Sequence, residues 1–242
     1  MRSDSERALL AVPRWVLIML ALCLCAQIAW QLVQPRPTAR ADALQAPPPV
    51  TALRSASLGE PIAFAQLLTL HLQAFDNQPG VSIPFLGLDY SRVIAWLSAI
   101  LEIDPAGQYP LMMAAHLYGQ VPDTAKQGEM CDFVRRQFSA DPNRRWRWLA
   151  HCAIMAKHRL RDMRLAHSYA EAITREARHA SGWARQMQVF ILEDLGEREA
   201  ATVLLGGLLA GGEVTEPTEI HFLTRRLEEL KGAGNSSGPS KK

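Results

Sequence analysis

No excess of either charge marks this sequence, because 26 lysines and arginines stand against 24 acidic residues. A protein that binds a nucleic acid backbone needs a concentrated basic face, so this balance gives no support to nucleic acid binding. Cysteine is also scarce. The four cysteines form two separated pairs, Cys23 with Cys25 and Cys131 with Cys152, and neither pair has the spacing of a zinc site or a redox motif.

Catalytic motifs are missing as well. The sequence has no glycine-rich phosphate loop, no nucleophile elbow, and no pair of histidines one helical turn apart with a nearby glutamate. His151 and His158 are seven residues apart, which on a helix is about 10 Å and too far for one metal ion. Asp104 and Asp141 each precede a proline and are expected to end helices. We therefore expect neither an enzyme nor a site for a metal, a cofactor or a small-molecule substrate.

One long apolar run lies near the N-terminus. The segment from Trp15 to Pro35 carries no charge, and residues 15–33 have the length that crosses a hydrocarbon core of roughly 30 Å. We expect a transmembrane helix over 15–33 with the leader 1–14 in the cytoplasm, because a short leader before a single apolar segment usually stays there. The rest of the chain would then lie outside the cytoplasm, on a single-pass protein of the inner (cell) membrane. The alternative is a signal peptide cleaved near Ala39-Arg40-Ala41.

Two further segments have compositions that do not favour a packed hydrophobic core. Residues 34–61 contain six prolines and little apolar periodicity, and we expect a partly extended linker between the membrane and the folded domain. Residues 232–242, GAGNSSGPSKK, are expected to form a disordered polar tail. The folded domain is therefore expected over residues 62–231.

Within that domain the chain repeats an amphipathic helix every 35 to 37 residues. Four positions share the same surroundings, at spacings of 37, 36 and 35 residues: Val93, Met130, Ala166 and Ala201. Two helices with short turns occupy about this length, so each period is predicted to be a helical hairpin that needs stacked neighbours to bury its apolar face. After a first helix that begins near Ile62, helices are predicted at 88–104, 107–119, 124–140, 144–158, 162–178, 181–195, 197–210 and 217–231.

The second helix of each pair carries a recurring motif. A small or apolar residue is followed four positions later by another, and twice by a proline eight positions beyond. The matching residues are Val93, Leu97 and Pro105, then Met130, Val134 and Pro142, then Ala166 with Ala170 and Ala201 with Leu205. This motif resembles the second helix of the tetratricopeptide repeat, over residues 62–231, and Gly196 stands at the family's turn glycine. Arg178 and Glu213 replace the later prolines, and no first helix has the family's Trp-x-x-Leu-Gly run, so these repeats are divergent.

The resemblance implies a superhelix of about four helical hairpins. Every periodic segment follows the helical rule, so we expect residues 62–231 to be all-α without a sheet, closed by a capping helix at 217–231 and preceded by the transmembrane helix. The resemblance also implies a concave groove, lined by the first helix of each hairpin, where an extended peptide or a partner helix docks. The positions that would face this groove are Trp148, His151, Met155 and His158 in the third hairpin and Trp183, Gln186, Phe190 and Glu193 in the fourth.

An unusual run, Arg144-Arg145-Trp146-Arg147-Trp148, lies beside those positions. Guanidinium and indole groups suit binding surfaces because they bring charge and contact area with few torsions to freeze. Packing against the neighbouring hairpin is the alternative role for this run, as it is for Met155 and Phe190. The predicted partner-binding residues are Arg144, Arg145, Arg147, Trp148, His151, His158, Trp183 and Gln186.

These patterns together predict a membrane-anchored scaffold that binds a protein partner in a cell-envelope assembly of bacterial type. The alternative is a periplasmic assembly chaperone or an accessory subunit of an envelope enzyme, which a large polar groove would favour over a stable apolar interface. Cys131 and Cys152 are predicted on successive helices, where they would be buried thiols or, outside the cytoplasm, a disulfide.

Overall fold

The computed structural model describes residues 13–34, 41–212, 214 and 216–235. These residues form eleven α-helices, and 76% of them are helical. The prediction of a predominantly helical chain with one apolar helix near the N-terminus is therefore confirmed. Most of the predicted leader, and the predicted tail beyond residue 235, lie outside the described residues.

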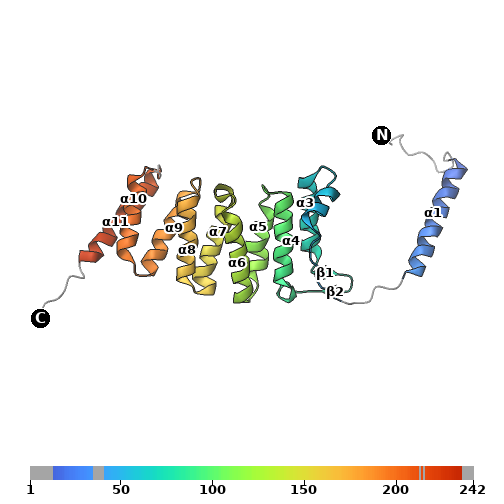
Figure 1. Cartoon of the computed structure of the whole chain (residues 1–242), viewed down its shortest axis with the longest axis horizontal. Coiled ribbons are helices and arrows are strands. Elements are labelled where there is room, and N and C mark those ends of the chain that lie inside the picture. Colours follow the sequence, from blue (N-terminus) through green and yellow to red (C-terminus); the bar gives the residue numbers. More distant parts are fainter. Residues whose placement is uncertain (1–12, 35–40, 213, 215, 236–242) are drawn as a thin grey trace, which may run out of the picture. The chain divides into compact units, whose positions relative to one another are not determined.

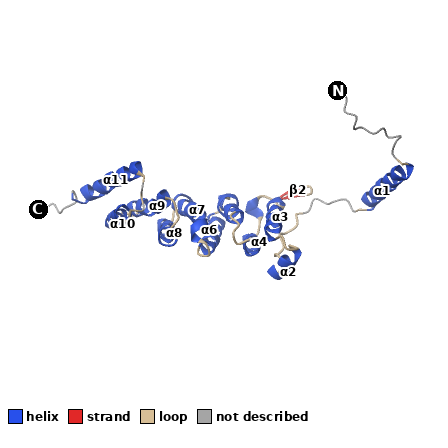
Figure 2. Ribbon diagram, turned by 90° about the horizontal axis from the view of Figure 1, so that it is seen from above, coloured by secondary structure: helices blue, strands red, loops and turns tan. Residues whose placement is uncertain are grey.

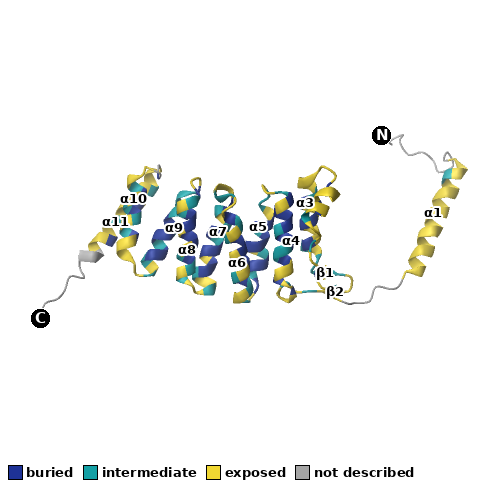
Figure 3. Cartoon of the chain, viewed as in Figure 1, coloured by how far each residue is buried: buried dark blue, intermediate teal, exposed yellow. Residues whose placement is uncertain are grey.

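The first helix, α1 (Arg14–Val33), has the dimensions of a membrane span. Its 20 residues extend about 30 Å, and none of them is buried. Figure 3 shows it exposed along nearly its whole length. Among the described residues it is the one helix that is long and apolar enough to cross a membrane, and a signal sequence has the same length and composition.

The helical body is a separate unit that comprises Asp42–Asn77 and the chain from Ser82 onward. Helix α2 packs against α4. From α3 onward the helices pack against their neighbours in the chain, with α6 packing against η3 and η4, which follow α5, and Figure 1 shows α3 to α11 side by side in a row. The elements are α2 (Val50–Ala56), α3 (Pro61–Ala74), η2 (Phe85–Gly87), α4 (Tyr90–Ile103), α5 (Tyr109–Met112), η3 (Met113–Leu117), η4 (Tyr118–Gln120), α6 (Thr124–Phe138), α7 (Pro142–Met155), η5 (Ala156–Leu160), α8 (Met163–Glu176), α9 (Gly182–Asp194), α10 (Arg198–Ala210) and α11 (Pro217–Asn235).

The periodic positions found in the sequence all point into the core. Val93 on α4, Met130 on α6, Ala166 on α8 and Ala201 on α10 each have 0% exposure. The helices that carry them follow the sequence pattern because each places its apolar residues on one face, which the neighbouring helices cover. Between α9 and α10, Gly196 adopts a φ of +81°, a conformation that residues with a Cβ rarely adopt.

Aspartates begin three of these helices in the same way. Asp89 accepts hydrogen bonds from the backbone N–H groups of Ser91 and Arg92 at the start of α4. Asp123 does the same at the start of α6, and Asp162 accepts from the N–H of Leu165 at the start of α8. Each such cap satisfies a backbone donor that the helix leaves free and typically contributes about 1 kcal/mol.

Apolar side chains fill two adjoining clusters in the body. The larger runs from Leu44 to Ile191, and the smaller joins α9, α10 and α11 around Leu205 and Leu223. Cys131 and Cys152 are fully buried free thiols within the larger cluster. Burial, with Cys131 as a close neighbour, raises the pKa of the Cys152 thiol.

The predicted linker is too long, because its second half belongs to the helical body. Leu44 and Leu53 are buried, and the indole Nε1 of Trp96 donates a hydrogen bond to the carbonyl of Gln45 at 2.8 Å. Figure 2 shows α2 beside α3 and α4. The prolines at 47–49 precede α2 instead of interrupting it, and proline before or in the first turn does not oppose a helix.

The prediction of a body without any sheet is also wrong at one point. Strands β1 (Asn77–Gln78) and β2 (Val81–Ser82) pair in a two-stranded sheet. The turn between them is Pro79-Gly80, and Gly80 has a φ of +77°. Proline followed by a glycine with positive φ favours a tight reversal, so the segment that ends α3 turns back on itself as a short hairpin. At the other end, α11 continues to Asn235, past the predicted boundary at residue 231.

Candidate docking groove between α7 and α9

A groove of about 430 Å³ lies between the end of α7, η5 and α9. Its walls include Ile154, His158, Trp183, Met187 and Phe190. Ile154 is 44% exposed and Trp183 is 52% exposed, which is high for large apolar side chains on a folded domain. The groove therefore offers apolar contact area to an occupant.

Trp183 is held in place by a second indole. The rings of Trp146 and Trp183 meet edge to face with centroids 5.5 Å apart, and Trp146 packs against the core. The guanidinium of Arg147 lies over the Trp146 ring at 5.8 Å. An aromatic side chain that is fixed on one edge and open on a face loses little conformational freedom when a partner covers it.

Basic side chains gather at the η5 end of the groove. His158, Arg159 and Arg161 are exposed there, whereas the nearby Asp162 is engaged as the cap of α8. Lys157 forms an ion pair with Asp194 at the end of α9. The arrangement suits an occupant that places an apolar side chain in the groove and a carboxylate beside η5.

The structure separates the eight predicted partner-binding residues into different roles. Only His158 and Trp183 line the groove. Arg144 and Arg147 are exposed outside its lining, and Arg144 lies 3.8 Å from Asp141. The remaining four, Arg145, Trp148, His151 and Gln186, are used by the fold itself.

Arg145 is the clearest correction, because it is buried and cannot meet a partner. Its exposure is 3%, and its guanidinium donates to the carbonyls of Gln137 at 2.5 Å and Pro105 at 2.8 Å. Both carbonyls lie near helix ends, where backbone acceptors lack partners inside the helix. Arg145 therefore joins α7 to the turn after α4 and to the end of α6.

Trp148 and His151 pack against the preceding hairpin. The Nε1 of Trp148 donates to the Oε1 of Gln108 at 2.9 Å, and its ring meets His116 edge to face. The rings of His151 and His116 are 3.8 Å apart, and the Nε2 of Gln120 lies 3.2 Å from the Nε2 of His151. Burial, the neighbouring His116 and the more distant Arg159 lower the pKa of His151 to about 4, which keeps the imidazole neutral at pH 7.

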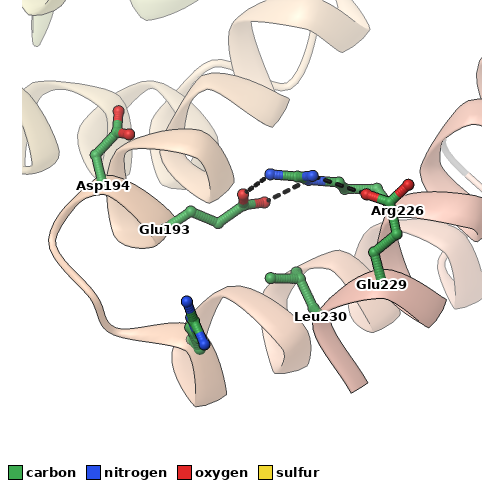
Figure 4. Close-up of a pocket in the computed structure, with 6 residues that line it drawn as sticks. Glu193, Asp194, Arg226, Glu229 and Leu230 are labelled. Atoms are coloured by element: carbon green, nitrogen blue, oxygen red, sulfur yellow. Dashed lines mark hydrogen bonds and ion pairs between the residues drawn. The ribbon is translucent and has the colours of Figure 1, made fainter. Parts of the chain in front are cut away.

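Helix α11 covers the face of α9 that the prediction left open for a partner. Gln186 is buried and donates to Glu219 of α11, and Glu193 forms an ion pair with Arg226. Figure 4 shows Arg226 reaching across to Glu193 while also bonding Glu229 on its own helix. These charges pair with one another around a hollow of about 380 Å³. Gln186 and Glu193 therefore hold the last helix in place instead of lining the groove.

Other groove residues were missed by the sequence analysis. Ile154 precedes His158 by four residues, and Met187 follows Trp183 by four, so both pairs share a helix face. Met155, which was assigned to the groove, is 3% exposed and faces the core. The predicted register of α7 was wrong by one residue here, so Met155 was assigned to the groove in place of Ile154.

Within the described residues, no group of three or more histidine, cysteine, aspartate or glutamate side chains is placed to hold a metal ion. Comparison of the chain with family models, with curated proteins and with solved structures finds no match. The groove and the exposed helix faces are therefore the features that point to a function.

The burial of Arg145 predicts a large effect on stability. We expect Arg145→Ala to lower the free energy of unfolding by about 3 kcal/mol, because buried hydrogen bonds from a charged group to the carbonyls of Gln137 and Pro105 are lost. Urea unfolding of the full-length protein in detergent, followed by circular dichroism, measures this. Arg144→Ala is the matched control, since its side chain is 58% exposed, and it should change the free energy by less than about 0.5 kcal/mol. Equal effects of the two changes would contradict the structural role.

The depressed pKa of His151 predicts a loss of stability in acid. A histidine whose pKa is lower in the folded state than in the unfolded state binds protons preferentially when unfolded. Its stabilising contribution is therefore present above pH 6.5 and is lost as the pH falls toward about 4. We expect His151→Gln to flatten the decline of unfolding free energy over this range, and the exposed His158→Gln to leave it unchanged. An identical pH profile for wild type and His151→Gln would contradict this.

Proposed function

We propose that the protein is a membrane-anchored scaffold whose helical body binds another protein through the groove between α7 and α9. The observation that carries this proposal is the pair of large exposed apolar side chains, Trp183 and Ile154, in one groove. Tryptophan is enriched among the residues that dominate binding energy at protein interfaces. A solvent-filled groove with an indole fixed along one wall is suited to a partner segment with its own apolar anchor.

The occupant that fits best is a segment with an apolar side chain and acidic neighbours. The exposed His158, Arg159 and Arg161 favour carboxylates at one end of the groove and raise the association rate with an acidic segment. This is a steering role, whereas the indole and aliphatic contacts of Trp183 and Ile154 supply the affinity. No catalytic step is part of the proposal.

We further propose that the body is a divergent tetratricopeptide-like superhelix. Support comes from the buried residues at the four repeat positions and from the packing of each helix on the next. In this arrangement α7 and α9 are the first helices of the third and fourth hairpins, α10 completes the fourth, and α11 is the cap. Stacking of one repeated hairpin would then account both for the groove and for the need for a capping helix.

An assembly chaperone or an accessory subunit of an envelope enzyme is the second candidate. A transient client would be favoured by a broad polar surface that contacts it weakly. The groove instead has largely aliphatic and aromatic walls, at Ile154, Met187 and Phe190 in addition to Trp183. This lining supports a stable partner, because burying apolar area gains about 25 cal/mol per Å².

Removal of the exposed indole tests the groove. We expect Trp183→Ala in the detergent-solubilised full-length protein to weaken capture of the co-purifying partner at least tenfold, because a truncated aromatic anchor typically costs 2 kcal/mol or more. The partner is the protein that co-elutes with the wild type at fixed stoichiometry. Val203→Ala, at a 76% exposed apolar position on α10, is the matched control and should capture it as the wild type does. Unchanged capture by a folded Trp183→Ala protein would contradict the proposed site.

The proposed location is the inner (cell) membrane, with α1 as a single anchor and the helical body outside the cytoplasm. A reporter that is active only outside the cytoplasm, fused after Lys242, is expected to be active. A reporter that requires the cytoplasm is expected to be silent at the same position. Activity of the second reporter would reverse the orientation, and absence of residues 1–41 from the mature protein would replace the anchor with a cleaved signal.

A further inference from the structure

Helix α3 exposes an apolar face that carries no charge. Residues 61–75 include no aspartate, glutamate, lysine or arginine. Ala65, Leu68 and Leu72 are buried against the body, yet Leu67 and Leu70 on the opposite side are 60% and 61% exposed. Gln66 and His71 are also exposed, but leucines this exposed on a folded domain are suited to a partner that covers them.

The far end of the body shows that an exposed terminal helix need not be apolar. Helix α11 buries Leu223 and Leu230 and exposes charged residues such as Arg225 and Glu228. Its outer face is mixed, because these charged residues lie beside Ile220 and Phe222, which are 38% and 41% exposed. Helix α3 has no aspartate, glutamate, lysine or arginine on its outer face, and this distinguishes it from α11.

The exposed residues of α3 follow the spacing of a coiled-coil seam. Ala63, Leu67, Leu70 and Ala74 are all exposed and lie four, three and four residues apart. Such spacing places the four side chains in one line along a helix, where they insert between the side chains of a facing helix. The order small, large, large, small reads the same in both directions. An antiparallel copy of the same helix is therefore complementary to it.

We propose that a second copy of this chain docks on α3, so that two α3 helices pair antiparallel about a two-fold axis. Leu67 of one copy then lies opposite Leu70 of the other, and Ala63 lies opposite Ala74. A two-fold interface uses the same patch on both subunits, which is what a self-complementary seam provides. The absence of charge over residues 61–75 means that two identical faces meet without repulsion.

A hollow beside Leu70 gives the seam room for the facing leucine. It has a volume of about 300 Å³ and is lined by Gln66, Thr69, Leu70, Gln73 and Tyr109. The Nε2 of Gln73 donates to the hydroxyl of Tyr109 at 2.9 Å, which fixes the tyrosine at its edge. In coiled coils, a side chain of one helix inserts into a space of this kind between side chains of the facing helix.

The expected dimer is weak in free solution and stronger at a membrane. A helix of 14 residues is about 21 Å long, and a pair of such helices buries less than the roughly 1,200 Å² of a stable interface. Anchoring by α1, which is itself part of the proposed function, confines both copies to one membrane and raises their effective concentration. The affinity of the dimer therefore depends on the anchor, whereas the pairing of the two α3 helices depends on the seam alone.

Cross-linking in lipid nanodiscs that hold two copies tests the pairing with the full-length chain. In a background of Cys23→Ala and Cys25→Ala, the double change Leu67→Cys with Leu70→Cys is expected to form a covalent dimer on mild oxidation, and either single change is expected to give at least fivefold less. Antiparallel pairing sets residue 67 against residue 70 of the other copy. Equal cross-linking by Leu70→Cys alone would show a parallel pair, and no cross-link from the double variant would show no pair; either result overturns the proposal.

A charge-insertion variant provides an independent measurement. Leu67→Glu with Leu70→Glu is expected to lower the dimer fraction, measured by fluorescence energy transfer in liposomes, at least tenfold, with circular dichroism confirming an intact fold. Val203→Glu, at another exposed apolar position, should leave it unchanged. An unaltered dimer fraction in the double variant would overturn the proposal and leave lipid or another protein as the occupant of α3. Trp183→Ala should not affect dimerisation. The proposed partner-binding groove and the proposed dimer seam can therefore be disproved independently of each other.

Discussion

A pair of short helices cannot bury its own apolar surface, and every other feature of the helical body depends on this limit. The inward side chains of α4, α6, α8 and α10 are buried only because the helices before and after them in the chain cover them. Each pair therefore needs a neighbour on both sides. Helices near the two ends of the row lack a neighbour on one side. The outer face of α11 combines charged residues with Ile220 and Phe222, whereas that of α3 exposes Leu67 and Leu70 and carries no charged residue.

Polar side chains then fix the spacing between neighbouring pairs by using the free carbonyls at helix ends. Arg145 reaches the carbonyls of Pro105 and Gln137, and the hydroxyl of Tyr90 donates to the carbonyl of Tyr118 at 2.8 Å. Apolar packing alone tolerates small slides of one helix along another, but hydrogen bonds from a buried donor to backbone carbonyls restrict such slides. The arginines and aromatics that look like a binding surface in the sequence are partly committed to this internal role.

The sequence was sufficient to predict most helices because their periodicity is imposed by burial on one face. The repeat marks from Val93 to Ala201 fall on fully buried positions for that reason. Helix α2 could not be found this way, since its single buried residue, Leu53, leaves no period to detect. Arg145 was misassigned because its acceptors lie 8 and 40 residues away, and no local pattern shows that distant carbonyls will surround it. Of the positions expected to face a groove, His158, Trp183 and Phe190 line this one, but the register of α7 puts Ile154 in the lining instead of Met155.

The proposed groove and the proposed seam lie on different helices, and this separation has a consequence for binding. Residues of α3 pair the two copies, while Trp183 and His158 on each copy remain open to a partner. The proposed dimer would present two grooves at a fixed separation. A partner with two matching segments, or a partner that is itself a dimer, gains affinity from the second contact because that contact has become intramolecular. A groove of modest size can therefore support a lasting assembly, provided that the seam and the anchor hold the two copies together.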